Sequence, residues 1–125
     1  MAAPTVALVA HDAKKADIVD WARTHVDALQ PFTIIATGTT GGRLTDEAGL
    51  TVDRLLSGPL GGDAQLGAMI AEGRLDALIF FIDPLSALPH DVDVKSLLRL
   101  AILYDTPLAV NRASADAVLA GLSRE

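Results

Sequence analysis

Short apolar runs alternate with amphipathic stretches along this chain, and the alternation predicts its secondary structure. The apolar runs are rich in Val, Ile and Leu and are bounded by turn-forming residues, so they predict β-strands. These strands are expected at residues 5–10, 32–36, 50–56, 77–82 and 108–110. The third run is the weakest because Asp53 and Arg54 interrupt it, whereas the fourth is the most apolar and fits a central strand.

Hydrophobic residues recur at helical spacing between these strands. The clearest helix has Asp12 as its expected N-cap and ends before Pro31, with His25 on its surface. Its buried stripe is expected to be Ile18, Trp21, Ala22, Val26 and Leu29. Further helices are predicted at residues 43–48, 63–72, 93–104 and 114–122, with Asp63, Asp93 and Ser114 as capping residues.

The alternation of strands and helices predicts the fold class. Parallel strands joined by right-handed crossovers place helices on both faces of a sheet. Such a sheet needs a core of Ala, Val, Leu and Ile, which fits a chain that is 50% hydrophobic but only 4% aromatic. We therefore predict a single α/β domain over residues 1–125, a Rossmann-like three-layer sandwich with a five-stranded, mainly parallel sheet.

Charge and composition exclude several classes of protein. The net charge of −6 argues against a general nucleic-acid binder, because phosphate backbones are bound by Lys and Arg. The absence of cysteine excludes disulfides, zinc–thiolate sites and cysteine nucleophiles. No stretch reaches the roughly 20 apolar residues of a membrane span, and the N-terminus lacks the charged region of a signal peptide. We expect no nucleic-acid partner, no membrane association and a cytoplasmic location.

Chemically active side chains gather just past the predicted strands or at the starts of predicted helices. The clusters are His11-Asp12, residues 37–41, residues 57–63, Asp83-Pro84 and residues 90–93. The carboxyl ends of parallel strands meet at one edge of an open sheet, where ligands bind. We therefore expect these clusters to form one site.

Two of the clusters suit an anion such as phosphate. Threonine hydroxyls and free amides at a helix start can wrap a phosphate, and glycines let a backbone approach a ligand closely. The candidates are Thr37, Gly38, Thr39, Thr40, Ser57 and Gly58, with Lys15 as a cation near the first strand. The alternative for residues 37–41 is a turn with a threonine cap. Neither cluster is a P-loop or a dinucleotide-binding motif.

Carboxylates and imidazoles at the same edge suit proton transfer. The candidates are Asp12, Asp63, Asp83, Asp93, His11 and His90. His90 has no obvious packing role, so it is the best candidate for a proton shuttle near neutral pH. Helix capping is the alternative for Asp12, Asp63 and Asp93, and a turn before proline is the alternative for Asp83. A metal site is less favoured, because the threonine and glycine segments already explain an anion site without one.

The ordered set of these segments resembles the methylglyoxal synthase family. It comprises Ala10-His11-Asp12 with Lys15, residues 36–41, residues 57–63, residues 80–85, residues 89–95 and residues 97–101. The resemblance implies a homohexamer without a metal or an organic cofactor. It also implies a lyase that converts dihydroxyacetone phosphate to methylglyoxal and inorganic phosphate through an enediolate, with phosphate as product and inhibitor.

The resemblance implies roles for individual residues. Asp63 resembles the family's general base. The residues that resemble phosphate contacts are Lys15, Thr37, Thr39, Thr40, Ser57 and Gly58. His11 and His90 resemble substrate-binding residues, with His90 next to the carbonyl and hydroxyl oxygens. The acidic residues expected around that site are Asp12, Asp83 and Asp93.

The chain departs from the family pattern at its end. Some family members carry an arginine on a C-terminal tail, which reaches the phosphate of a neighbouring subunit. Arg124 does not align with that arginine. The contact between subunits is therefore not carried over to this chain.

Two other functions are compatible with the same fold. The first is a regulatory domain that binds an anionic metabolite, which is disfavoured because the acidic set with Asp63 and His90 is present. The second is a receiver-like domain phosphorylated on an aspartate. Asn111-Arg112 stands where that domain needs a lysine, so this function is disfavoured as well.

Overall fold

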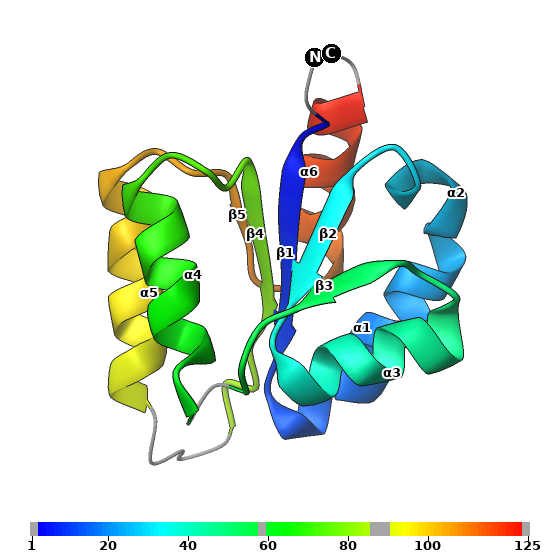
Figure 1. Ribbon diagram of the computed structural model, residues 1–125, viewed down its shortest axis with the longest axis horizontal. Helices are drawn as coiled ribbons and strands as arrows, with labels where there is room; N and C mark the ends of the chain where they lie inside the picture. Colours follow the sequence, from blue (N-terminus) through cyan, green and yellow to red (C-terminus); the bar gives the residue numbers. More distant parts are fainter. Residues whose placement is uncertain (1–2, 58–59, 86–90, 124–125) are drawn as a thin grey trace.

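The computed structural model of the chain describes residues 3–57, 60–85 and 91–123. In these ranges one sheet contains β1 (Thr5–Ala10), β2 (Thr33–Ala36), β3 (Val52–Arg54), β4 (Ala77–Phe81) and β5 (Leu108–Ala109), in the order β3-β2-β1-β4-β5 (Figure 1). Each neighbouring pair is parallel, with Leu8 opposite Ala36 on one side of β1 and opposite Ile79 on the other. The predicted α/β fold is confirmed, and the sheet is entirely parallel.

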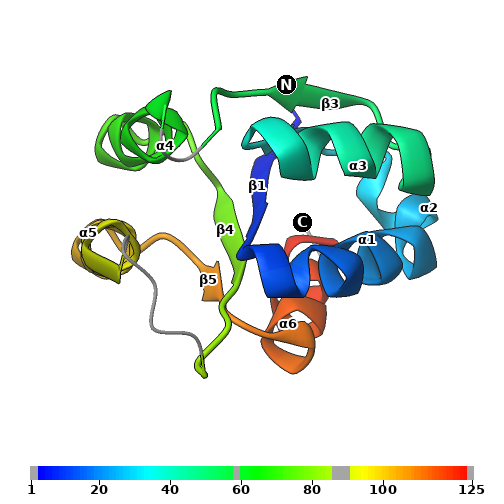
Figure 2. The same cartoon turned by 90° about the horizontal axis from the view of Figure 1, so that it is seen from below.

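Helices cover both faces of this sheet, as crossovers between parallel strands require. One face carries α1 (Lys15–Thr24), α2 (Val26–Leu29), α3 (Gly38–Ala48) and α6 (Arg112–Ser123), with a 3-10 helix (Asp12–Lys14) ahead of α1. The other face carries α4 (Gly62–Ala71) and α5 (Asp91–Leu103). Figure 2 shows the two helix layers on opposite sides of the strands.

Each face of the sheet has its own apolar core. Successive residues of a strand point to opposite faces, so Val6 and Leu8 pack with α1, α3 and α6, while Ala7 and Val9 pack with α4 and α5. Trp21 is the largest fully buried side chain and belongs to the first core. The Trp21 Nε1–H donates to Asp116 Oδ1 on α6 at 2.8 Å, and this bond joins α1 to α6.

The direction of the chain through the sheet reverses beside β1, and this reversal positions the candidate site. The chain leaves β1 toward the α1 face, and it leaves the neighbouring strand β4 toward the α5 face. The crevice between two such connections is the usual ligand site of open α/β sheets. Figure 2, seen from below, looks onto this carboxyl edge of the strands.

The helix predicted between Asp12 and Pro31 is interrupted at His25, so the prediction of one continuous helix is wrong. His25 has φ −109° and ψ 20° and separates α1 from α2. Its ring Nδ1 and its backbone N lie 2.8 and 3.1 Å from the carbonyl oxygen of Trp21. His25 is therefore half-buried at a break in the helix, rather than on an open helix surface.

Helix α3 begins earlier than predicted, at Gly38 rather than at Arg43. The Gly41 N–H donates to the Thr37 carbonyl at 2.8 Å, so the first turn is already helical. The segment interpreted as a loop is thus a helix start, with its amides facing the carboxyl edge of the sheet.

Strand β3 is shorter than the predicted range 50–56. Its neighbour β2 ends at Ala36, whose carbonyl accepts the N–H of Leu55 at 2.8 Å. The next N–H, that of Leu56, donates instead to Oε1 of Gln65 on α4 at 2.8 Å. The chain therefore turns away from the sheet toward α4 at this point.

The predicted helix caps are shifted along the chain. His11 is the N-cap of the 3-10 helix, and Asp12 is the first residue of that helix. Gly61 is the N-cap of α4, and Asp63 is the second residue of α4. Helix α5 likewise begins before Asp93. Asp12 and Asp63 therefore do not occupy the N-cap positions that the sequence predicted for them.

The last helix also starts before its predicted cap. Asn111 precedes α6, and its Oδ1 accepts the N–H of Ser114 at 3.0 Å. Ser114 Oγ accepts the N–H of Asn111 at 3.2 Å in return. Asn111 and Ser114 together form this cap, in the reciprocal manner of a capping box.

Candidate functional site

His11 joins the carboxyl ends of β1 and β4. The Asp83 N–H donates to His11 Nδ1 at 2.9 Å, and the His11 N–H donates to the Phe81 carbonyl at 3.2 Å. The imidazole packs edge-on against Phe80, with ring centroids 5.2 Å apart. Because Nδ1 accepts a hydrogen bond, the neutral ring carries its proton on Nε2. The crevice therefore contains an imidazole of defined tautomer beside Asp83.

Asp12 and Lys15 form an ion pair just after β1. The Lys15 Nζ contacts Asp12 Oδ1 across one helical turn. The Lys15 side chain is only 16% exposed, whereas the Asp12 side chain is 96% exposed. Lys15 is thus held against the protein at the edge where an anion is expected.

The first turn of α3 carries the threonines of the candidate anion site. Thr37 occupies the N-cap position and is buried, Thr39 is exposed, and Thr40 is only 1% exposed. In the part of the chain that the structure describes, Thr40 Oγ1 is buried without a hydrogen-bond partner. Buried hydroxyls in proteins are nearly always bonded, so this hydroxyl calls for a hydrogen-bond partner that the described residues do not supply.

The glycine-rich segment after β3 packs directly on this helix start. The Gly38 N–H donates to the Leu56 carbonyl at 3.4 Å, and a Cβ on Gly38 would lie 3.1 Å from Ser57 N. Gly62 approaches more closely still, because its Cβ would lie 2.0 Å from Leu56 O and 3.0 Å from Thr37 Cγ2. The two segments can touch only because glycine stands at these positions.

Asp63 lies in the first turn of α4, directly after Gly62. The Gly62 N–H donates to the Ser57 carbonyl at 2.9 Å, which ties this turn to the segment after β3. Asp63 is half-buried and lines a hollow of about 380 Å³ between α4 and α5. In the chain, Asp63 therefore directly follows the glycine at which the two candidate anion-binding segments touch.

Part of the predicted site lies outside the described residues. This applies to Gly58 and His90, and to the side chain of Asp93 within α5. The remaining candidates are His11, Asp12, Lys15, Thr37, Gly38, Thr39, Thr40, Ser57, Asp63 and Asp83. All of these follow the carboxyl ends of β1 to β4 or begin the next helix. Their catalytic and binding roles stay predictions.

Two residues at this edge were not predicted from the sequence. Gln65 holds the turn after β3 through its bond to the Leu56 N–H. Arg54, the last residue of β3, donates from Nε to the Gly38 carbonyl at 3.1 Å. A charged residue that interrupts an apolar strand is a signal that could have drawn attention to Arg54. The contact of Arg54 with Gly38 depends on how α3 packs beside β3, so the sequence could not show it.

Two ion pairs on helix surfaces shift the pKa values of their members. Arg112 holds the pKa of Asp20 below its usual value, first through a hydrogen bond of 2.5 Å and then through its charge. A hydrogen bond from Arg43 lowers the pKa of Glu47, and the same bond raises the pKa of Arg43. Both pairs are exposed, the first joining α1 to α6 and the second lying within α3, so these shifts concern the stability of the helices.

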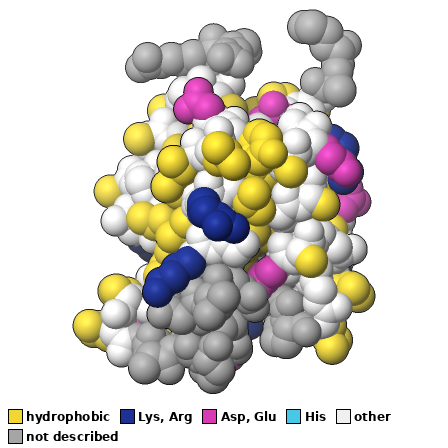
Figure 3. All heavy atoms as spheres, turned by 90° about the vertical axis from the view of Figure 1, so that its left-hand side faces the viewer, with side chains coloured by type: hydrophobic (Ala, Val, Ile, Leu, Met, Phe, Trp, Pro, Cys, Tyr) yellow, Lys and Arg dark blue, Asp and Glu magenta, His cyan; other side chains and the backbone are white. Residues whose placement is uncertain are grey.

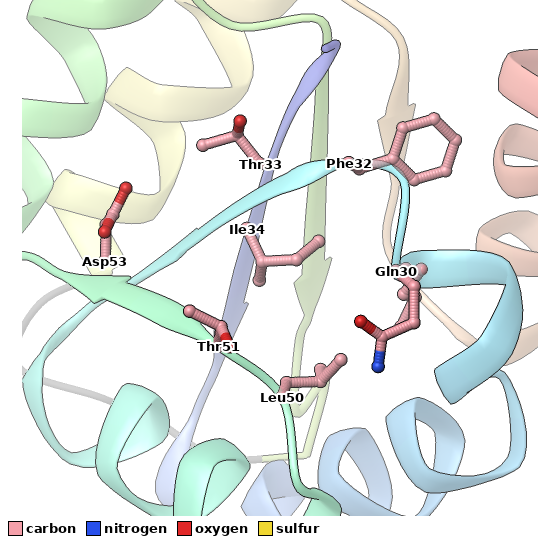
Figure 4. A pocket seen from close by; sticks show the side chains of 8 residues that line it. Gln30, Phe32, Thr33, Ile34, Leu50, Thr51 and Asp53 are labelled. Atoms are coloured by element: carbon pink, nitrogen blue, oxygen red, sulfur yellow. The ribbon is translucent and has the colours of Figure 1, made fainter.

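Two further hollows are less suited to an anion. The hollow in Figure 4, of about 340 Å³, is lined by Leu29, Gln30, Phe32, Thr33, Ile34, Leu50, Thr51 and Asp53. No Lys or Arg is among these lining residues, and Asp53 would repel an anion. A larger hollow of about 600 Å³ lies beyond β4 and β5, but its cations Lys14 and Arg112 are paired with aspartates.

The edge combines groups for anion binding with groups for proton transfer. Hydroxyls, helix-start amides and Lys15 suit a phosphate, while His11, Asp63 and Asp83 can exchange protons. Within residues 3–57, 60–85 and 91–123, no group of three or more His, Asp or Glu side chains is arranged to hold a metal ion. None of the helices within these ranges combines the length and the hydrophobicity of a membrane-spanning segment.

The chain matches a family model and curated relatives. The model described as MGS-like domain matches residues 17–110. The methylglyoxal synthase of Agrobacterium fabrum (strain C58) is 62% identical over 112 residues, which cover 89% of this chain and 88% of the relative. The methylglyoxal synthase of Brucella ovis is 58% identical over 118 residues, which cover 94% of each chain.

A solved structure has the same fold. It is the crystal structure of methylglyoxal synthase from Elizabethkingia anophelis NUHP1, with a TM-score of 0.89 and 50% sequence identity. The match covers 94% of this chain and 77% of that one. With the family model spanning most of the chain and relatives this similar, the chain belongs to the methylglyoxal synthase family.

Proposed function

We propose that the carboxyl edge of the sheet is the active site at which this lyase converts dihydroxyacetone phosphate to methylglyoxal and inorganic phosphate. The observation that carries the proposal is the contact between the start of α3 and the segment after β3, directly beside Asp63. This contact brings anion-binding groups and a base candidate together. Membership of the methylglyoxal synthase family supports the same reaction.

The phosphate of the substrate binds at the start of α3. The amides of the first helical turn and the positive end of the helix dipole attract it. The proposed contacts are Lys15, Thr37, Gly38, Thr39, Thr40, Ser57 and Gly58. The buried hydroxyl of Thr40 supports this assignment, because a phosphate oxygen would give it the hydrogen-bond partner it lacks among the described residues.

Asp63 is the proposed general base. Its carboxylate removes a proton from the hydroxymethyl carbon, and the electrons of that C–H bond pass into an enediolate with the neighbouring carbonyl. Hydrogen-bond donors at the developing oxyanion stabilise this intermediate. His90 is the proposed donor and is oriented by Asp93. His11, whose neutral ring carries its proton on Nε2, is a further donor.

The geometry of the phosphate group decides what happens to the enediolate. Its electrons expel inorganic phosphate when the bridging C–O bond stands perpendicular to the enediolate plane. The enol that remains gains a proton on carbon and becomes methylglyoxal, so no water is consumed. Residues that hold the phosphate therefore select elimination over isomerisation, in addition to binding the substrate. Asp12 and Asp83 are proposed to set the charge around this centre.

Asp63→Asn tests the proposed base. Purified protein is incubated with dihydroxyacetone phosphate, and methylglyoxal and inorganic phosphate are measured together. We expect equimolar products from the wild type and a loss of about 100-fold or more in turnover from the variant, since a positioned base contributes about 10²–10⁴-fold. Near-normal turnover by a folded Asp63→Asn variant would show that the base is another residue.

Asp27→Asn is the matched control for this experiment. Asp27 is exposed on α2, so the variant makes the same change of charge away from the site. Its turnover should equal that of the wild type. If a folded wild-type protein binds phosphate but forms no product, the regulatory-domain alternative replaces the lyase.

Assembly into a homohexamer is part of the proposal. At the end of α5, Ile102, Leu103 and Tyr104 are 74%, 69% and 50% exposed. Figure 3 shows hydrophobic side chains gathering on the α4–α5 side of the molecule. Contiguous exposed apolar surface marks interaction sites, which supports self-association. Light scattering tests this proposal, because a hexamer has six times the 13.0 kDa mass of one chain.

Product inhibition follows from the proposed phosphate site. Inorganic phosphate and the phosphate of the substrate would occupy the same groups, so inorganic phosphate should raise the apparent KM without changing kcat. The cytoplasmic location, the lack of a cofactor and the lack of a nucleic-acid partner stay predictions from composition and resemblance.

A further inference from the structure

Arg54 reaches from the end of β3 onto the first turn of α3. Its Nε–H donates to the Gly38 carbonyl at 3.1 Å. Two glycines leave room for the side chain: a Cβ at Gly41 would lie 2.8 Å from Arg54 Cγ, and a Cβ at Gly42 would lie 3.4 Å from Nη2. The Arg54 side chain therefore packs on the surface of α3 at Gly41 and Gly42, where there are no side chains to exclude it.

The charge of Arg54 is not neutralised by a protein carboxylate within the described ranges. Arg43, Arg74 and Arg112 each pair with an Asp or Glu there. Arg54 bonds a carbonyl oxygen instead, and its side chain is exposed. A full positive charge is thus held on the helix turn whose amides face the candidate anion site.

An anion at the start of α3 would interact with this charge. An α-helix rises about 1.5 Å per residue, so a phosphate on the first-turn amides lies within about 5–8 Å of a guanidinium seated on Gly38 and Gly42. That separation is below the Debye length of about 8–10 Å at ordinary ionic strength. The attraction to a phosphate dianion is therefore only partly screened by salt.

We infer that Arg54 is a positioning residue of the phosphate site, which fixes the first turn of α3 through Gly38 and holds a positive charge beside the phosphate of the substrate. The inference rests on the proposed function. It adds a residue outside the set that the sequence pattern assigned. Because the phosphate is bound in both the ground state and the transition state, Arg54 should affect KM more than kcat.

Arg54→Met tests the inference, because methionine keeps an unbranched stem over the two glycines but lacks the charge and the Nε–H. The dissociation constant of inorganic phosphate is measured by calorimetry, and kcat and KM are measured with dihydroxyacetone phosphate. We expect both the dissociation constant and KM to rise about three- to tenfold, with kcat changed less than about twofold. Arg54→Lys keeps the charge without the planar donor group, so it should give intermediate values.

Arg23→Met is the matched control. Arg23 also donates to a carbonyl of α3, that of Glu47 at the opposite end of the helix, at 3.1 and 3.0 Å. The control therefore removes the same charge and the same kind of bond far from the helix start. Its phosphate affinity and KM should match those of the wild type. Thermal unfolding of both methionine variants separates any loss of stability from a loss of binding.

Each outcome distinguishes this inference from the proposed function. If the wild type makes methylglyoxal but Arg54→Met has the same KM and phosphate affinity as Arg23→Met, the inference is wrong and the function stands. If the wild type binds phosphate without turnover and Arg54→Met weakens that binding, the role of Arg54 stands and the function is wrong. A wild type that binds no phosphate would overturn both.

Discussion

Gly62→Ala should disrupt the contact on which the candidate site depends. A Cβ at this position would lie 2.0 Å from Leu56 O, 3.0 Å from Leu56 C and 3.0 Å from Thr37 Cγ2. Ordinary contacts between carbon and a carbonyl oxygen are about 3.3–3.6 Å. Two backbone segments must therefore separate by more than about 1 Å, since a carbonyl group cannot turn aside as the end of a side chain can.

The cost of this separation can be worked from the bonds that it strains. The Gly62 N–H donates to Ser57 O at 2.9 Å, and the Leu56 N–H donates to Gln65 Oε1 at 2.8 Å. Overpacking costs about 1–3 kcal/mol, and each weakened hydrogen bond adds about 0.5–1.5 kcal/mol. We expect the free energy of unfolding to fall by about 3–4 kcal/mol, which corresponds to a fall in Tm of about 10–15 °C.

Gly121→Ala is the control, because nothing lies within 4 Å of a Cβ at Gly121 in α6. Alanine in a helix is favoured over glycine by about 0.5–1 kcal/mol, so this variant should be slightly stabilised. Urea unfolding of both variants and the wild type measures the difference, and phosphate binding shows whether a folded Gly62→Ala protein keeps the site. A Gly62→Ala variant within about 1 kcal/mol of Gly121→Ala would refute the argument from close approach.

Two further predictions concern the joining of α1 to α6. Asp116→Ala should lower the free energy of unfolding in urea by about 1–2 kcal/mol, because it leaves the buried Trp21 Nε1–H without its acceptor. Asp116→Asn keeps an oxygen at this position and should recover most of the loss. Equal losses in the two variants would exclude the hydrogen bond as the cause. Arg112→Gln should raise the pKa of Asp20 toward its ordinary value of 3.8 in an NMR titration, because Arg112 lowers it through a hydrogen bond and charge. Since the folded pKa is depressed, the pair stabilises the fold above the unfolded pKa, and this stabilisation is lost as the pH falls through the folded pKa. An unchanged titration in the variant would contradict that cause.

The layers of the fold could be predicted because hydrophobic periodicity reports burial directly. The run at 77–82 is apolar at every position, and β4 is covered by helices on both faces, so each of its residues is buried. The stripe with Ile18 and Trp21 faces the sheet as its spacing predicts. The break at His25 could not be predicted, because it depends on a bond to a carbonyl four residues earlier in a chain that otherwise keeps helical spacing.

The gathering of candidate residues at one edge could be predicted, but the contacts between them could not. The rule that parallel strands end together brought His11 and Asp83 to the same place, and the structure joins them by a hydrogen bond. The early start of α3 was missed because glycine and threonine are weak helix formers. The roles of Gly62 and Arg54 depend on distances between segments far apart in the sequence, which local patterns do not contain.

The two helix layers divide the proposed chemistry between them. The phosphate candidates Lys15 and Thr37 begin helices packed on one face of the sheet, whereas the base candidate Asp63 begins a helix packed on the other. A substrate at this edge would bridge the two helix layers. Its phosphate would be bound by residues of one layer, and its reacting carbon would lie next to Asp63 of the other layer. A small slide of one layer over the strands would therefore rotate the C–O bond relative to the enediolate plane. Packing far from the site, and not only the residues that touch the substrate, would then set how cleanly the enzyme eliminates phosphate.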